Sequence, residues 1–305
     1  MVKIRVPATT ANLGPGLDTL GMALSLYLTV EMTFSGQGTT IEFTGYGRDE
    51  LMEKPEQNLV YKAACLVMQQ AGLYERGLKL HIHNEIPVGK GLGSSASAIV
   101  AGIYAANRLL KKPFAEEQLL SWAVKMEGHA DNIVPAVVGG LAIVMQRDED
   151  VFYQQLEVPS ELKTVLAVPE FVLATTQSRS VLPTQISLAN TVSSLQRACF
   201  LIASLVNADY SQLAAAMHDP VFLAERKNLI PGFDRVLANA LKAGALGAAL
   251  SGAGPSVIAL TLDKTDKIGE AMQESFAAAG ISSEIFILRP SENGIKYLDE
   301  DGIAE

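Results

Sequence analysis

Cysteine is scarce in this chain: its 305 residues include two, Cys65 and Cys199, which are far apart in the sequence and form no CxxC pair. This scarcity argues against both a disulfide-stapled framework and a zinc site, and it fits a reducing compartment. Each cysteine lies in an apolar helical pattern, so we expect both side chains to be buried as small hydrophobic groups.

Long uninterrupted hydrophobic segments are also missing. The longest uncharged run, residues 243–262, is broken at its centre by the sequence SGAGP, so we interpret it as two short buried strands joined by a turn. The N-terminal residues lack the apolar core of a signal peptide. The sequence therefore predicts a cytoplasmic protein with no membrane partner.

The chain also has no excess of basic residues. It contains 24 Lys and Arg residues and 33 Asp and Glu residues, which gives a net charge of −9. A net-acidic chain is a poor general binder of nucleic acid, so we expect no such partner. Hydrophobic residues make up 49% of the chain and charged residues 19%, which excludes disordered and collagen-like classes.

Strand and helix patterns mix irregularly along the chain. The first half predicts strands at residues 2–6 (ended by Pro7), 23–34, 78–83, 139–145 and 151–158, and helices at 58–71, 94–110 and 115–126. The second half predicts strands at 164–168, 246–250, 257–262 and 283–288, and helices at 186–208, 210–217, 231–243 and 264–279. Because no regular βαβ repeat appears, the predicted fold class is α+β, with domains at residues 1–158 and 159–305.

A glycine-rich loop between a predicted strand and a predicted helix is the most informative segment. Glycines let the backbone approach a ligand closely, and the unpaired amides at a helix start attract phosphate. The alternative is a flexible connection with a serine cap. The spacing matches neither the Walker A loop nor the dinucleotide fingerprint. The loop residues are Pro87, Val88, Gly89, Lys90, Gly91, Leu92, Gly93, Ser94, Ser95, Ala96 and Ser97.

Two further segments favour the phosphate interpretation: residues 7–21 (PATTANLGPGLDTLG) and residues 250–257 (LSGAGPSV). Together with the loop at residues 87–97 they resemble, in order and spread, the three motifs of the GHMP kinases (galactokinase, homoserine, mevalonate and phosphomevalonate kinases). The resemblance implies a two-domain fold, with an N-terminal domain like domain 2 of ribosomal protein S5 and a ferredoxin-like C-terminal domain.

Details within these motifs resemble the homoserine kinase branch rather than the sugar kinases. They are the first motif, the segment EGHADNIVPAVVGG at residues 127–140, RSVLP at 179–183 and RKNLIPG at 226–232. One departure is present: the family usually has a tyrosine–arginine pair before the last segment, whereas Ala224 and Glu225 precede Arg226 here. The alternatives are a family member that phosphorylates another small alcohol, or a non-catalytic nucleotide-binding protein of the same fold.

The resemblance implies that the loop wraps the triphosphate of ATP, and that Ser95 and Glu127 bind Mg²⁺, which accepts hydroxyl and carboxylate oxygens. A surface glutamate at a helix end is the alternative for Glu127. Many relatives have an aspartate base at the position that corresponds to Asn132, and an amide cannot take up a proton at neutral pH. Glu127 and Asn132 are therefore the catalytic candidates, without an obvious protein base. Asp131 is an alternative base, or it caps the following turn.

The implied substrate is L-homoserine, a small zwitterion with a hydroxyl group. Its carboxylate requires a fork-shaped cation, for which Arg179 and Arg226 are the candidates, although either could be a surface arginine. Its ammonium group requires anionic or carbonyl partners, for which Asn12 and Asp18 are the candidates. We expect His129 and His218 to be structural. The oligomeric state is left open, with a homodimer as one candidate.

Overall fold

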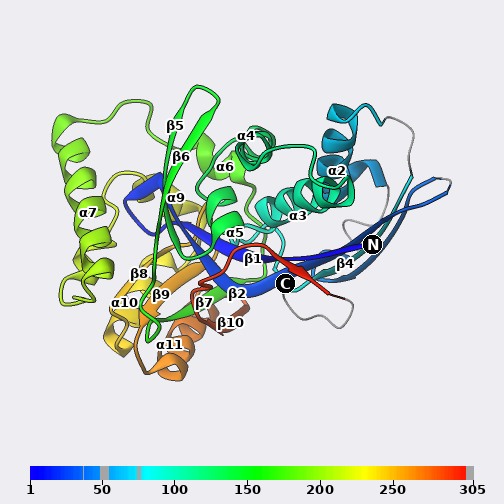
Figure 1. The fold of residues 1–305 in the computed structure, drawn as a ribbon. Coiled ribbons are helices and arrows are strands. Elements are labelled where there is room, and N and C mark those ends of the chain that lie inside the picture. The colour runs from blue at the N-terminus through cyan, green and yellow to red at the C-terminus, as the bar shows by residue number, and fades with distance from the viewer. Residues whose placement is uncertain (37, 49–54, 74–76, 300–305) are drawn as a thin grey trace.

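The computed structural model describes residues 1–36, 38–48, 55–73 and 77–299, which form two β-sheets with helices packed on each (Figure 1). Among these residues the first sheet has the order β11-β1-β2-β4-β3, and β5 extends it by pairing with β2 and β6. Its strands are β1 (Val2–Asn12), β2 (Gly16–Phe34), β3 (Thr40–Gly45), β4 (Leu78–Asn84), β5 (Leu141–Arg147), β6 (Asp150–Leu156) and β11 (Lys296–Leu298).

The first sheet buries one face under helices. Alternation in β4 turns Leu78, Leu80 and Ile82 inward, where they are at most 2% exposed. Helix α3 is the central helix of this layer because it packs on β1 and β2 and carries α2 and α4 on its flanks. Its small residues allow these close contacts, and most of its length is buried. The helices are α2 (Leu59–Gln70), α3 (Ser94–Leu109), α4 (Glu116–Glu127) and α5 (Ile133–Val138).

The second sheet has the order β10-β7-β9-β8 with antiparallel neighbours throughout. In chain order, strands and helices follow one another as β7, α10, β8, β9, α11 and β10, which is the ferredoxin-like arrangement. This confirms the predicted fold class. The elements are β7 (Lys163–Pro169), α10 (Phe233–Ala243), β8 (Gly247–Leu250), β9 (Val257–Thr261), α11 (Thr265–Ala277) and β10 (Ser283–Leu288).

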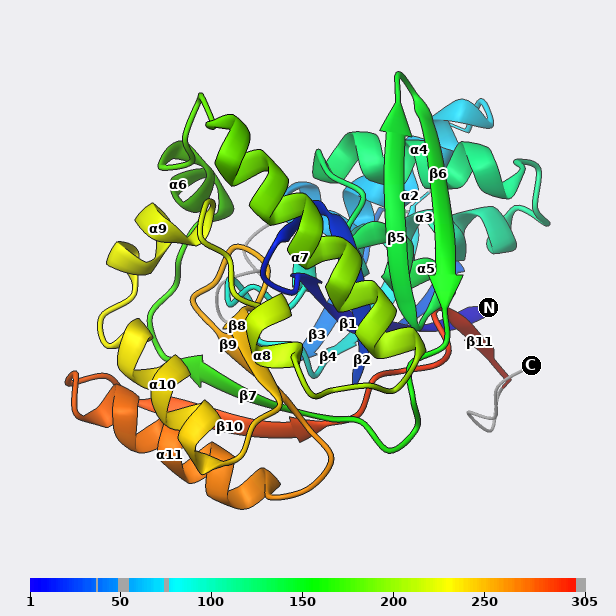
Figure 2. The same cartoon turned by 90° about the vertical axis from the view of Figure 1, so that its left-hand side faces the viewer.

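Between β7 and α10 the chain forms a helical excursion on one side of the molecule (Figure 2). Helix α7 crosses the front of this view and packs against α8. The described chain also contains two short 3-10 helices, at Pro55–Gln57 and Lys227–Leu229. The helices of the excursion are α6 (Thr175–Ser180), α7 (Leu188–Val206), α8 (Leu213–Ala216) and α9 (Leu223–Arg226).

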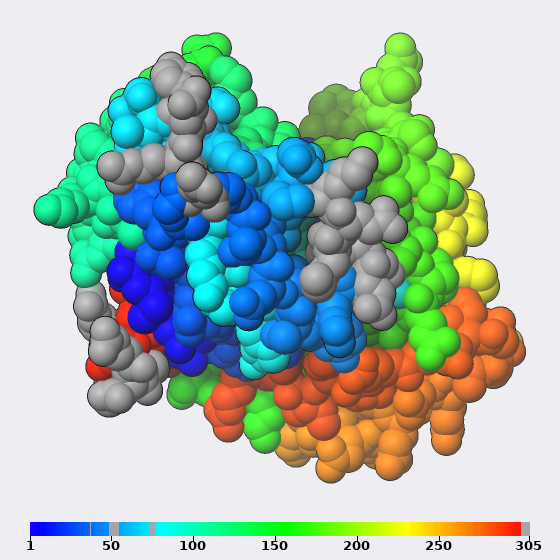
Figure 3. Space-filling view, turned by 90° about the vertical axis from the view of Figure 1, so that its right-hand side faces the viewer, coloured from blue at the N-terminus to red at the C-terminus, as the bar shows by residue number. Residues whose placement is uncertain are grey.

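The two halves of the chain contact one another, and a strand of the C-terminal half joins the first sheet. Blue and cyan segments of the N-terminal half lie against orange segments of the C-terminal half in Figure 3, and Tyr46 Oη donates to Glu284 Oε2 at 2.8 Å between them. The chain then returns to the first sheet, because β11 pairs with β1. The division at residues 158 and 159 falls between β6 and β7 and stays a prediction.

Several local predictions were wrong. Pro7 does not end the first strand, because a register shift between Pro7 and Ala8 lets β1 continue to Asn12 without the missing N–H. Cys199 is exposed and Cys65 half-buried. The helix predicted at residues 210–217 shortens to α8. Residues 243–262 contain β8 and β9, as predicted, and no helix in the described ranges is long and apolar enough to cross a bilayer.

Candidate active site

The three glycine-containing motifs meet at one place in the fold. Ser251 Oγ donates to the Gly91 carbonyl oxygen at 2.7 Å and shares a 2.9 Å hydrogen bond with Thr10 Oγ1. The backbone closes the same junction, because the amide of Thr9 donates to Leu92 and that of Gly252 donates to Ala11. Segments from both halves of the chain therefore form a single site around the glycine-rich loop.

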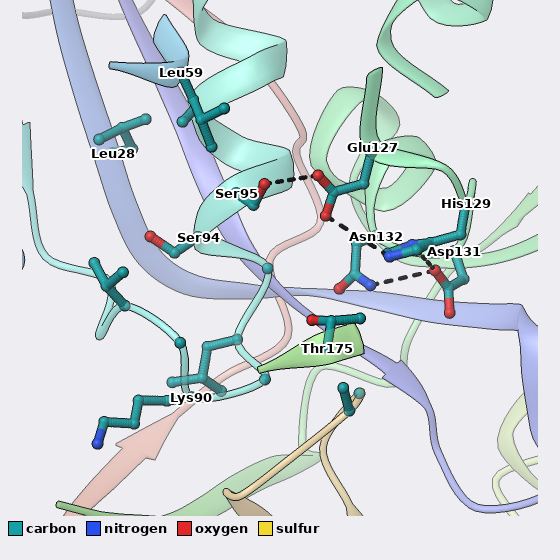
Figure 4. A pocket seen from close by; sticks show the side chains of 18 of the residues that line it. Leu28, Leu59, Lys90, Ser94, Ser95, Glu127, His129, Asp131, Asn132 and Thr175 are labelled. Carbon is teal, nitrogen blue, oxygen red and sulfur yellow. Dashed lines mark hydrogen bonds and ion pairs between the residues drawn. The ribbon is translucent and has the colours of Figure 1, made fainter. Parts of the chain in front are cut away.

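A pocket of about 300 Å³ opens beside this junction (Figure 4). One part of its wall is apolar, with Leu28 and Leu59 visible in Figure 4, and the opposite part is polar and charged. The apolar lining comprises Leu28, Phe43, Leu59, Val60, Ile82 and Val88, and the charged lining comprises Lys90, Glu127, His129, Asp131, Arg179 and Arg226. The pocket suits an elongated ligand with an apolar end and a charged end.

The glycine-rich loop has the backbone that a phosphate-binding loop requires. Gly89, Gly91 and Gly93 have φ values of +68°, +76° and +67°, which favour glycine. A Cβ on Gly93 would lie 2.0 Å from Thr9 Oγ1, so no side chain fits there. Gly93 is also the N-cap of α3, whose first amides therefore face the pocket as orphan donors.

Most, but not all, of the predicted loop residues line the pocket. Residues 88–95 do so, whereas Pro87 lines a separate cavity and Ala96 and Ser97 are fully buried. Ser97 Oγ donates to the Pro7 carbonyl oxygen at 2.8 Å, so this hydroxyl faces β1 instead of a ligand. These three residues therefore do not line the pocket: Ala96 and Ser97, in the first turn of α3, belong to the core, and Pro87 lies at the other cavity.

The Lys90 side chain extends away from the other labelled side chains of the pocket (Figure 4). Its ammonium group donates to the carbonyl oxygens of Pro169 and Phe171, both at 2.8 Å, and to that of Glu170. Lys90 thus ties the glycine-rich loop to the end of β7. Because its ammonium group is bound there, Lys90 lines the pocket mainly with its backbone and the aliphatic part of its side chain.

The two predicted metal ligands touch one another. Ser95 Oγ donates to Glu127 Oε2 at 2.7 Å, at the point where the start of α3 meets the end of α4. The Glu127 side chain is 12% exposed, and burial raises the pKa of its carboxyl group against the lowering effects of Ser95 and His129. A partly desolvated carboxylate beside a hydroxyl is an incomplete oxygen donor set. In the described part of the chain, no group of three His, Cys, Asp or Glu residues forms a metal cluster.

A hydrogen-bonded network continues from Glu127 across the site. His129 Nε2 lies 3.8 Å from Glu127 Oε1, and His129 Nδ1 lies 2.8 Å from Asp131 Oδ1. Asn132 Nδ2 donates to the same Asp131 oxygen at 3.2 Å, and Thr9 Oγ1 donates to Asn132 Oδ1 at 2.8 Å. Asp131 thus bonds side chains and does not cap the following helix, contrary to one of the two sequence interpretations.

Two residues of this network were not assigned to the site from the sequence. His129, which the sequence suggested to be structural, lines the pocket. Burial lowers its pKa, but the hydrogen bond to Asp131 and the charges of Asp131 and Glu127 outweigh that effect, so the pKa is raised overall. Thr9 stands inside the first motif, yet nothing in the sequence spacing links it to Asn132.

Arg179 and Asp18 form a bidentate ion pair. Arg179 Nη1 and Nη2 donate to the two Asp18 carboxylate oxygens at 3.1 and 2.5 Å. The Asp18 hydrogen bond raises the pKa of the Arg179 guanidinium. Both residues had been assigned to the substrate, one to its carboxylate and one to its ammonium group, and the structure brings them together. Sequence reasoning had no means of pairing them, because they are 161 positions apart.

Arg226 is 4% exposed and lies in the same wall of the pocket. Within the described chain its guanidinium makes one hydrogen bond, from Nε to the Ser178 carbonyl oxygen at 3.1 Å. Burial and then the like charge of Arg179 lower its pKa. Asn12, by contrast, uses its whole side-chain amide in contacts with the backbone: Nδ2 donates to the Gly252 carbonyl oxygen, and Oδ1 accepts from the Asp18 amide. Asn12 therefore holds the wall of the pocket in place.

Comparison with known proteins places this fold and site in a family. The model of the GHMP kinases N terminal domain matches residues 58–140, and that of the GHMP kinases C terminal domain matches residues 201–278. The crystal structure of homoserine kinase from Cytophaga hutchinsonii superposes with a TM-score of 0.87 at 34% identity and covers 97% of both chains. The mevalonate kinase of L. major, at 18% identity and a TM-score of 0.70, shares the fold.

The chain belongs to the GHMP kinases, a family of ATP-using enzymes. A homoserine kinase from Carboxydothermus hydrogenoformans is 43% identical over 96% of both chains. Another from Moorella thermoacetica is 41% identical and covers 96% of this chain and 99% of its own. These relatives confirm the sequence prediction of the homoserine kinase branch and of a kinase with an alcohol acceptor.

Proposed function

We propose that this protein transfers the γ-phosphoryl group of ATP to the side-chain hydroxyl of L-homoserine, which gives ADP and O-phospho-L-homoserine, a step of threonine biosynthesis. One observation carries the proposal. A single pocket joins a glycine-rich helix start, suited to phosphate, to two arginines, one of which is paired with Asp18, and these charges suit a zwitterion. The relatives named homoserine kinase support the same reaction.

The apolar part of the pocket accepts the adenine ring, and the loop between Val88 and Ser95 accepts the triphosphate. Orphan amides at the start of α3 and the positive end of the helix dipole stabilise the phosphate charge. Catalysis of phosphoryl transfer consists mainly of positioning and charge stabilisation, so this cradle supplies much of what the reaction needs.

Ser95 and Glu127 would hold Mg²⁺. The donor set fits the ion, because a hydroxyl and one buried carboxylate lie 2.7 Å apart next to the phosphate loop. Mg²⁺ binds through one or two carboxylates and completes its octahedron with waters and nucleotide phosphates, so a larger protein cluster is not required. The bound ion would neutralise charge that develops on the phosphates.

The substrate zwitterion fits the charges in the wall. Its carboxylate binds between Arg226 and Arg179, whose mutual repulsion an anion relieves, and its ammonium group binds Asp18. Insertion of a zwitterion into the Arg179–Asp18 pair exchanges each charged partner for an equivalent one, so neither side chain is left without a partner. A neutral alcohol would have to separate the pair without replacing it.

The substrate hydroxyl oxygen then forms the new P–O bond while the bond between the γ-phosphorus and the bridging oxygen of ADP breaks. Asn132 orients the site and takes no proton, because its amide oxygen accepts from Thr9 and its amide nitrogen donates to Asp131. The hydroxyl proton passes to a phosphate oxygen or to water. This leaves Asp131, whose Oδ1 atom is bonded to His129 and Asn132, as an orienting group.

A coupled assay of ADP release with the purified full chain, ATP and Mg²⁺ tests the reaction. L-Homoserine should be phosphorylated, whereas homoserinol, mevalonate, galactose and shikimate should react at least 100-fold more slowly in kcat/KM. A preference for mevalonate or a sugar would show another family activity. Nucleotide binding without turnover of any alcohol would show a non-catalytic member. The predicted cytoplasmic location is supported by the two free cysteines and is part of the proposal.

A further inference from the structure

A second, smaller cavity of about 70 Å³ lies next to the pocket of the active site. Asn12, Arg226 and Gly252 line both spaces, so they form the wall that separates them. Most of the second cavity is apolar, and its titratable side chains are those of Arg226, Asp219 and His218. The carboxylate of Asp219 therefore lies on the side of Arg226 that faces away from the substrate pocket.

Asp219 is buried, with 7% of its surface exposed, and its two carboxylate oxygens differ in their contacts. Oδ1 accepts from the backbone amides of Val221 and Phe222, both at 2.9 Å, and so holds the turn that leads into α9. Within the described chain, no group donates a hydrogen bond to Oδ2. A buried carboxylate of this kind needs an opposite charge to offset its loss of hydration.

Arg226 supplies that opposite charge. Burial raises the pKa of Asp219, whereas the two backbone amides and the charge of Arg226 lower it. Burial lowers the pKa of Arg226, and Asp219 is among the carboxylates that raise it. Asp18 and Asp131 also raise it, but Asp131 lines the substrate pocket and Asp18 is bonded to Arg179. Asp219 thus compensates the charge of Arg226 from the second cavity.

The charged groups at the substrate end of the site balance one another. Arg179 is paired with Asp18. Arg226 is compensated by Asp219, so two positive charges are matched by two negative ones. A zwitterion has no net charge and leaves this balance intact. Without the charge of Asp219 the substrate end would have one positive charge in excess, and an anion would gain stabilisation there.

We propose that Asp219 determines the charge selectivity of the substrate site: through its effect on Arg226 it favours a zwitterionic alcohol over an anionic one. The inference rests on the proposed function, because it takes the alcohol to be bound by its carboxylate at Arg226. Asp219 lines the second cavity and not the substrate pocket, so it is a positioning residue that acts on the substrate through Arg226. Selectivity then arises from disfavouring the wrong ligand as well as from binding the right one.

Three alcohols that differ in charge test this role. L-Homoserine is a zwitterion, 4-hydroxybutyrate lacks the ammonium group, and homoserinol has a hydroxymethyl group in place of the carboxylate. Asp219→Asn removes the charge but keeps an oxygen that accepts from the amides of Val221 and Phe222. Its kcat/KM should rise about 10-fold for 4-hydroxybutyrate and fall about 10-fold for homoserinol. For homoserine it should stay within about threefold of the wild type, because the effects on its two charges oppose one another.

Asp209→Asn is the matched control. Asp209 also accepts from the amide two residues further on, that of Ser211, at 3.1 Å, but it is exposed and lines neither the substrate pocket nor the second cavity. This variant should keep the wild-type preference among the three alcohols. Asp219→Ser is a second uncharged variant whose hydroxyl can accept from the same amides, and it should reproduce the shift of Asp219→Asn. Thermal unfolding of each variant reports whether the fold is intact.

An equal change for all three alcohols in both Asp219 variants would make Asp219 a structural residue and overturn the proposal. The same shift in Asp209→Asn would assign the effect to the net charge of the protein and would also overturn it. A wild type that phosphorylates none of the alcohols would contradict the proposed function instead. Calorimetric binding of the three compounds then replaces turnover, and unchanged ratios of affinity in Asp219→Asn would overturn the role of Asp219.

Discussion

Ser95, at the start of α3, donates a 2.7 Å hydrogen bond to Glu127, at the end of α4. The bond holds a helix that begins with phosphate-facing amides against a helix that ends in a buried carboxylate. Two chemically different parts of the site are therefore fixed relative to one another before any ligand arrives. Phosphoryl transfer depends on such preorganisation, because the protein itself takes little part in the covalent chemistry.

Replacement of Glu127 by glutamine should lower kcat about 100-fold or more. The amide keeps the size of the side chain but removes the charge that balances a divalent cation, and metal stabilisation of the transition state contributes several kcal/mol. Steady-state kinetics across a Mg²⁺ titration measures the effect. Glu116→Gln, at the exposed start of the same helix, is the control and should behave like the wild type. A normal rate for Glu127→Gln at low Mg²⁺ would assign the metal to another carboxylate.

Replacement of Gly93 by alanine should raise the KM for ATP at least 10-fold. Its Cβ would lie 2.0 Å from Thr9 Oγ1 and 3.2 Å from Asn132 Oδ1, so the loop, Thr9 or both must move. Gly72→Ala is a sharp control, because Gly72 has a φ of +74° and no atom within 4 Å of the new Cβ. Alanine at position 72 would have the same unfavourable left-handed backbone conformation, which costs about 1 kcal/mol, but its Cβ would collide with no other atom. Equal ATP affinity of the two variants would show that the loop does not bind the nucleotide.

Replacement of Arg226 by lysine should raise the KM for homoserine about 10- to 100-fold and leave the KM for ATP nearly unchanged. A bidentate, charge-assisted contact with a carboxylate contributes about 1.5–3 kcal/mol, and an ammonium group cannot reproduce its geometry. Homoserinol lacks the carboxylate, so its kcat/KM should change little in the variant. Arg179→Lys should behave similarly towards homoserine, and in addition it loses the bidentate bond to Asp18. A loss of equal size for both alcohols would make Arg226 a structural residue.

The His129–Asp131 pair should make stability depend on pH. The pKa of His129 is raised in the folded protein, so its stabilising effect is complete below the unfolded value of about 6.5 and is lost as pH rises through the folded value. His129→Gln should therefore destabilise the protein more at pH 5.5 than at pH 9, with a loss of about 1.5–3 kcal/mol at the lower pH. Urea unfolding at the two pH values measures the difference. The same loss at both would mean that the charge of His129 does not contribute.

Local patterns predicted much of the fold. Residues 78–83 alternate cleanly, and the structure has β4 there; Asn58 before an apolar helix appears as its N-cap, where it accepts from the amide of Tyr61. Short elements whose form depends on distant partners were not predicted. They include β3, α5, α6, α9 and β11, of which β11 has three residues and exists through its pairing with β1.

For the site, the motifs located the correct segments but not their contacts. Arg179, Asp18 and Arg226 were all singled out, yet their arrangement depends on how α6 and α9 of the helical excursion pack near the start of β2, where Asp18 lies. Helix α7 shows a related limit, because Leu188 and Leu195 belong to its apolar pattern and are nevertheless exposed. An apolar period identifies a helix equally well whether its apolar side faces the core of its own chain or the solvent.

The return of β11 to the edge of β1 has a consequence for how this chain is made. Lys3, Ile4 and Arg5 are paired with Leu298, Tyr297 and Lys296, so the edge of β1 stays open until residues 296–298 have left the ribosome. Contacts of such long sequence separation slow folding, and an open edge invites pairing with other chains. During synthesis the first strand therefore has an unpaired edge until β11 is made, and a stop codon before β11 would leave that edge unpaired permanently.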